Sequence, residues 1–98
     1  MKFEISNSKL EQVVFIYLDN KNFDIVNGGS IPENYYFLDN DFLTITFIHS
    51  SGTCIISYEL FKEIQTFFSI DKTETIKDFV KKYVENKLNV EVSRVVIS

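Results

Sequence analysis

The sequence predicts an α+β fold: a mostly antiparallel sheet of five to seven strands, meander first, with two C-terminal helices packed on one face and a final strand. Two observations carry this prediction. The first two thirds of the chain alternates in polarity between turn clusters, whereas apolar residues in the last third recur at helical spacing. The 98 residues leave room for one core, so residues 1–98 are predicted to form a single domain.

Six segments of the first two thirds are predicted as strands. Lys2–Ser6 alternates between apolar and polar residues, which suits a strand with one wet side. Gln12–Leu18 is apolar on both faces, which is typical of a central strand covered on both sides. The clearest alternation runs over Phe42–His49. Shorter strands are expected at Phe23–Val26, Tyr35–Leu38 and Cys54–Ser57.

Two helices and a closing strand are expected after that. An apolar stripe behind an N-cap at Ser57 predicts the first helix, and its members are Leu60, Phe61, Ile64, Phe67 and Phe68. The second helix is expected from about Thr75, whose hydroxyl caps it, to a left-handed terminator at Asn89. Residues Val90–Ile97 are rich in β-branched side chains and are predicted to return to the sheet.

Composition and charge exclude several classes of protein. Hydrophobic residues make up 45% of the chain and charged residues 24%, which is typical of soluble globular proteins. No apolar run approaches the ~18–20 residues of a membrane-spanning helix, so no membrane partner is expected. Ten basic against fourteen acidic residues give a net charge of −4, the wrong sign for direct nucleic-acid binding. With a lone cysteine, no secretory signal and no cofactor fingerprint, the chain is predicted to be cytoplasmic and to use no cofactor.

The single histidine and the single cysteine flank a predicted hairpin. If the turn at Ser50–Thr53 is tight, His49 faces Cys54 about 5 Å away. This pair supports the alternative hypothesis of a small enzyme or ligand-binding domain, because an imidazolium lowers the pKa of a neighbouring thiol. In one version of this hypothesis the pair lies at a homodimer interface. No oxyanion hole can be named beside the pair, and a free cysteine is usually a small core residue. Two ligands are too few for a structural zinc, so no metal site is predicted.

Acidic residues gather in two turns that a meander places at the same end of the sheet. Asp and Asn bond their own backbone in turns, which by itself explains both clusters. The negative patch that they form nevertheless suits a basic protein surface. Tyr35, Tyr36 and Phe23, near the Asn27-Gly28-Gly29 break and the acidic turns, are the aromatic residues expected outside the core. The predicted contact residues are Asp19, Asp24, Tyr35, Tyr36, Asp39 and Asp41.

The string Asn27-Gly28-Gly29, followed by Ile31-Pro32, resembles a fragment found in a large family of bacterial toxin-immunity proteins. The resemblance is confined to this short string. That family has a helix before the string, whereas the preceding segment here is predicted as strand. We therefore assign the chain to no family from it.

These observations favour a non-enzymatic protein-binding module. The expected function is that of a small acidic inhibitor, immunity or adaptor protein that masks a basic functional surface of a larger partner. Frequent Lys, Asn and Ile with a single arginine suggest a bacterial, phage or mobile-element genome. The sequence does not decide between a monomer and a homodimer. Two helices leave part of the sheet uncovered, and the strand Val90–Ile97 pairs across a two-fold axis if it lies at an edge.

Overall fold

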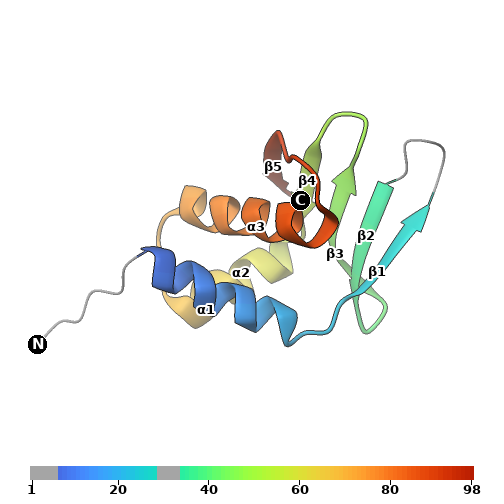
Figure 1. Cartoon of the computed structure of the whole chain (residues 1–98). Helices are drawn as coiled ribbons and strands as arrows, with labels where there is room; N and C mark the ends of the chain where they lie inside the picture. The colour runs from blue at the N-terminus through green and yellow to red at the C-terminus, as the bar shows by residue number, and fades with distance from the viewer. Residues whose placement is uncertain (1–6, 29–33) are drawn as a thin grey trace, which may run out of the picture.

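The computed structural model describes residues 7–28 and 34–98, which form three helices and five strands (Figure 1). In chain order the elements are α1 (Asn7–Asp19), β1 (Asp24–Gly28), β2 (Asn34–Asp39), β3 (Phe42–Ile48), β4 (Thr53–Ile56), α2 (Tyr58–Phe68), α3 (Thr73–Leu88) and β5 (Arg94–Ile97). The predicted strand Lys2–Ser6 lies outside the described residues.

The predicted fold class is confirmed. The sheet has the order β1-β2-β3-β4-β5, with antiparallel pairing from β1 to β4 and parallel pairing between β4 and β5. Parallel neighbours need a crossover connection, and here α2 and α3 supply it. The four-strand meander therefore precedes the two C-terminal helices and the last strand returns to the sheet, as the sequence predicted, whereas α1, which comes before the meander, was not expected.

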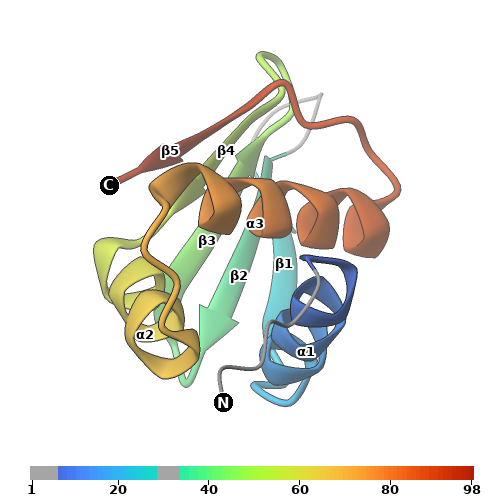
Figure 2. The same cartoon turned by 90° about the vertical axis from the view of Figure 1, so that its left-hand side faces the viewer.

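All three helices lie on one face of the sheet. Figure 2 shows α3 crossing in front of the sheet, with α1 and α2 beneath it on either side. The core lies between these layers and includes Phe37, Ile45 and Ile56 from the strands and Ile76 and Val80 from α3. None of the described helices covers the opposite face of the sheet, which is exposed toward the right of Figure 1.

The prediction of a central strand at Gln12–Leu18 is wrong, because this segment belongs to α1. Val14 and Leu18, one helical turn apart, are fully buried, while Ile16 between them is 60% exposed. Because every residue from Val13 to Leu18 is apolar, the sequence shows no helical spacing of apolar and polar residues in this run. A helix places only one side of such a run on the core, so Val13 and Ile16 stay in water while Phe15 and Tyr17 are partly buried at the edge of the core.

The two C-terminal helices and the last strand form as predicted, with three local differences. The Ser57 hydroxyl accepts a hydrogen bond from the Leu60 backbone N–H, which confirms the N-cap of α2, but Phe67 is 66% exposed rather than part of the buried stripe. Helix α3 begins at Thr73, with Lys72 as its N-cap, rather than at Thr75. Its C-cap is Asn89, which has the predicted left-handed conformation. Only Arg94–Ile97 of the predicted last strand pairs with β4.

Candidate protein-interaction site

A two-residue turn joins β2 to β3 and sets the position of the candidate site. Asp39 pairs with Phe42 across it, and the two residues between them, Asn40 and Asp41, have φ angles of 48° and 69°. Positive φ at both central residues defines the type I′ turn that suits tight hairpins, and Asn and Asp tolerate it better than most residues. The acidic turn predicted at residues 39–41 is therefore a tight hairpin tip.

The residues that follow this tip project apolar side chains into solvent. Phe42 is 76% exposed, the highest exposure of any large hydrophobic residue in the described chain, and Leu43 is also exposed. The register between the two strands shifts beyond Phe37, so Thr44 is an extra residue, and its hydroxyl donates to the Phe37 carbonyl at 2.8 Å. This bulge increases the local twist at the end of the hairpin.

A cleft of about 350 Å³ lies between the hairpin tip and α2. We call it the hairpin cleft. Helix α2 is held against this side of the hairpin by a hydrogen bond from the Ser57 N–H to the Thr44 carbonyl at 2.7 Å. The lining residues are Lys21, Asp39, Phe42, Leu43, Thr44, Ser57, Glu59, Leu60 and Glu63.

The charged groups of the hairpin cleft leave it negative. Lys21 lies 2.5 Å from Glu63 and 3.7 Å from Asp39, and the Tyr17 hydroxyl donates to Glu63 at 2.6 Å. Partial burial pushes the pKa of Glu63 upward, but the hydrogen bonds from Lys21 and Tyr17 outweigh this and hold the pKa below its ordinary value. One ammonium group therefore faces three carboxylates, because Glu59 also lines the cleft.

Glu59 is the carboxylate of the cleft that is most available to a ligand. It is exposed in the first turn of α2, where the helix dipole favours a negative charge. Among the described residues, no hydrogen bond or ion pair holds its carboxylate. The cleft thus combines an exposed aromatic ring, an exposed carboxylate and a partly neutralised acidic wall.

The structure separates the predicted contact residues. Asp39 and Asp41 form the hairpin tip, and Asp24, which begins β1, pairs with Leu38 at the same end of the sheet, as the meander predicts. Asp19 lies elsewhere, at the end of α1, where it accepts a hydrogen bond from Tyr83 at 3.1 Å and pairs with Lys87 at 2.6 Å.

The two predicted contact tyrosines point to opposite faces of β2. Tyr35 is partly buried and packs against the core, on the side of the helices. Its neighbour Tyr36 faces the uncovered side, because successive side chains of a strand alternate. Neither tyrosine lines the hairpin cleft.

The predicted pairing of His49 with Cys54 is wrong. Phe47 faces Cys54 and Ile48 faces Thr53, so the loop spans residues 49–52 instead of a two-residue turn at 51–52. Cys54 is fully buried, and burial raises the pKa of its thiol to about 12. His49 is exposed. A thiol in this environment stays protonated at neutral pH, so the geometry gives no support to a thiolate nucleophile.

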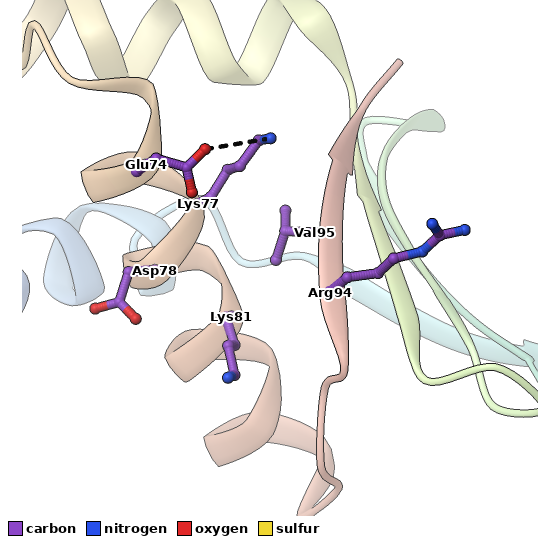
Figure 3. Close-up of a pocket in the computed structure, with 6 residues that line it drawn as sticks. All are labelled: Glu74, Lys77, Asp78, Lys81, Arg94 and Val95. Carbon is purple, nitrogen blue, oxygen red and sulfur yellow. Dashed lines mark ion pairs between the residues drawn. The ribbon is translucent and has the colours of Figure 1, made fainter.

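A second hollow lies between α3 and β5 and lacks the features of a ligand site (Figure 3). Glu74 pairs with Lys77 at 3.7 Å on its wall, and Arg94 points away from α3 to the other side of the sheet. Its charged groups therefore do not converge on one point. In residues 7–28 and 34–98 no cluster of His, Cys, Asp or Glu has the arrangement that a metal ion needs.

Sequence reasoning missed the two residues that define the hairpin cleft, Phe42 as an exposed ring and Glu59 as its acidic neighbour. Comparison with known proteins adds no assignment, because no family model, curated protein or solved structure matches this chain. None of the helices in the described part of the chain has both the length and the apolar character to cross a membrane.

Proposed function

We propose that the protein is a non-enzymatic, cytoplasmic protein-binding module: an inhibitor, immunity or adaptor protein that covers a basic surface of a larger protein. The observation that carries the proposal is the exposed Phe42 ring at the rim of the acidic hairpin cleft. Aromatic side chains that are buried at the centre of an interface provide much of its binding energy. The tight turn fixes the backbone that carries the ring, which reduces the conformational freedom lost on binding.

The charge of the same surface favours a basic partner. Three carboxylates and one ammonium group line the cleft, and Asp41 adds a further negative charge at the hairpin tip. The whole chain carries a formal charge of −4. Complementary charge accelerates the encounter of two proteins and makes the rate depend on salt.

The immunity version of this function draws no further support from the Asn27-Gly28 string. Helix α1 ends at Asp19, and Asn27 and Gly28 are the last residues of strand β1, so a strand directly precedes the string and the departure from the toxin-immunity family's pattern remains. That resemblance covers only a few residues, so the physical argument rests on the cleft.

Affinity capture with matched variants tests the proposal. The wild-type protein is used as bait in the cells that produce it, beside Phe42→Ala and Glu59→Arg. Phe67→Ala is the control for the ring, because Phe67 is also exposed on α2 but lies outside the cleft. Glu74→Arg is the control for the charge, because Glu74 occupies the first turn of α3 as Glu59 does that of α2.

We expect the wild type and both control variants to capture one basic protein in stoichiometric amount. Both cleft variants are expected to lose this partner, and added salt is expected to release it from the wild type. Recovery of no stoichiometric partner contradicts the binding module. Equal recovery by the cleft variants contradicts the cleft as its site.

A further inference from the structure

The uncovered face of the sheet carries a largely apolar row, with one threonine at its centre, that crosses all five strands. Strand pairing aligns Val26, Tyr36, Thr46, Ile55 and Val96 side by side. These side chains point away from the helices, because their neighbours Phe37, Ile45 and Ile56 are buried beneath the helices and successive side chains alternate. We call this surface the open face.

An apolar open face is unusual for a sheet that faces water. Antiparallel sheets with one covered face usually carry polar side chains on the other. Here both ends of the row are exposed, with Val26 at 45% and Val96 at 37%, and Leu38 and Ile48 flank it. Contiguous apolar surface of this kind usually marks an interface with another protein.

The open face carries one charge of each sign at diagonally opposite corners. Asp24 is the first residue of the edge strand β1, and it shares the alternation of Val26. Arg94 is the first residue of the other edge strand, β5, and pairs with Thr53 at the opposite end of the sheet. Figure 3 shows the Arg94 side chain directed away from α3, and its Nε donates to the Thr53 hydroxyl at 3.2 Å.

We propose that a second copy of this chain packs open face to open face, with Asp24 of each copy beside Arg94 of the other. The two-fold axis lies between the two sheets and runs along the diagonal that joins the two uncharged corners. Rotation about this axis places the Asp24 corner of one copy over the Arg94 corner of the other. The strands of the two sheets then cross at a large angle, which is one of the common ways in which sheets pack. A two-fold interface of this type makes each charge pair twice.

Charge selects a second copy as the occupant rather than the basic partner of the hairpin cleft. The charged residues that face outward from the five strands are Asp24 and Arg94, so the open face is neutral and complementary to itself. The cleft carries an excess of carboxylates and has no such self-complementarity. The dimer therefore does not depend on the function proposed for the cleft.

The size of the open face predicts a weak dimer. Five strands at a spacing of about 4.8 Å, with about five residues each at a rise of about 3.3 Å, make a flat area of roughly 400 Å² per copy. The interface then buries roughly 800 Å² in total, with more from side-chain relief, which is below the ~1,200 Å² of stable specific complexes and in the range of weak, transient ones. We expect dissociation in the micromolar range.

Sedimentation velocity from about 1 µM to about 500 µM tests the dimer. Val26→Lys places a charge in the row and is expected to weaken association at least tenfold. Ile16→Lys is the matched control, because Ile16 is an exposed aliphatic residue of α1 on the helix side, and it is expected to leave association unchanged. Far-UV circular dichroism confirms that each variant is folded.

A charge exchange tests the orientation of the two copies. Asp24→Arg and Arg94→Asp each place like charges together in the dimer, and each is expected to weaken it at least several-fold. The double variant is expected to restore association, because both pairs re-form with the signs reversed. A monomer throughout the concentration range, an equal effect of Ile16→Lys and Val26→Lys, or a double variant weaker than both single variants overturns the proposal. Because none of these variants changes the hairpin cleft, failure of the dimer is separate from failure of partner binding.

Discussion

The clearest prediction contrasts two phenylalanines of β3. Phe47 is 1% exposed and faces the core, whereas Phe42 is 76% exposed on the hairpin tip. Replacement of a buried Phe by Ala costs about 3–5 kcal/mol, since transfer energy is lost and a cavity remains. A Phe side chain offers about 200 Å² for burial, and about a quarter of that is buried at Phe42. At ~25 cal/mol per Å², Phe42→Ala costs about 1.2 kcal/mol.

Urea unfolding followed by circular dichroism measures both costs. The comparison requires the same dependence of the unfolding free energy on urea in all variants, so that the midpoints report stability. If Phe47→Ala does not fold at all, Phe47→Leu provides a milder core change, expected to cost less than Phe47→Ala but more than Phe42→Leu. A loss above about 2 kcal/mol for Phe42→Ala refutes the reasoning. Phe42 would then be needed for folding, and its exposure would not identify a binding residue.

Three further predictions concern the loop of β3–β4, the thiol and acid stability. Gly52→Ala is expected to lower the free energy of unfolding by at least about 1 kcal/mol, because Gly52 has φ 69° and a new Cβ lies 2.5 Å from the Ser93 hydroxyl. Adding Ser93→Gly to this variant is expected to recover part of the loss, as urea unfolding measures. Cys54 is expected to react with a thiol reagent only after unfolding, as spectrophotometry shows, because burial raises its pKa to about 12; rapid labelling of the native protein contradicts the buried position. The hydrogen bond with Lys87 holds the pKa of Asp19 below its ordinary value of 3.8, so the charge stabilises the fold above that pH and this contribution disappears as the pH falls through the folded pKa. Asp19→Asn should therefore make the free energy of unfolding, measured with urea, less dependent on pH in the acid range. Because the group is exposed, the expected difference is only a few tenths of a kcal/mol. A pH profile identical to that of the wild type contradicts this role.

Local chemistry made the strands and the last two helices predictable. Turn residues at 39–41 and alternation over Phe42–His49 report the hairpin directly, and the Ser57 cap marks the start of α2. The error at α1 arose where local chemistry is ambiguous. A short apolar run fits a buried strand and a helix equally well, and burial by the rest of the fold decides between them.

The candidate site was predictable only in part, because its residues come from distant segments. The acidic tip at Asp39 and Asp41 was expected from the turn. Lys21 follows α1 and Glu59 begins α2, and nothing in their local sequence shows that the two line the same cleft. The exposure of Phe42 likewise depends on where the helices stop covering the sheet. The parallel pairing of β5, which brings Arg94 to the open face, is also a property of the whole fold.

The two proposed surfaces have a joint consequence for stoichiometry. The open face lies on the side of the sheet away from the helices, whereas α2 forms one wall of the hairpin cleft. A dimer through the open faces therefore leaves both clefts free, and the complex is expected to contain two copies of the partner. If the partner is itself dimeric, the second cleft binds at a high effective concentration, and the affinity of the dimer exceeds that of the Val26→Lys monomer by about 10²-fold or more. Light scattering of the purified complex measures this stoichiometry, and a complex of one dimer with one monomeric partner at saturation contradicts the arrangement.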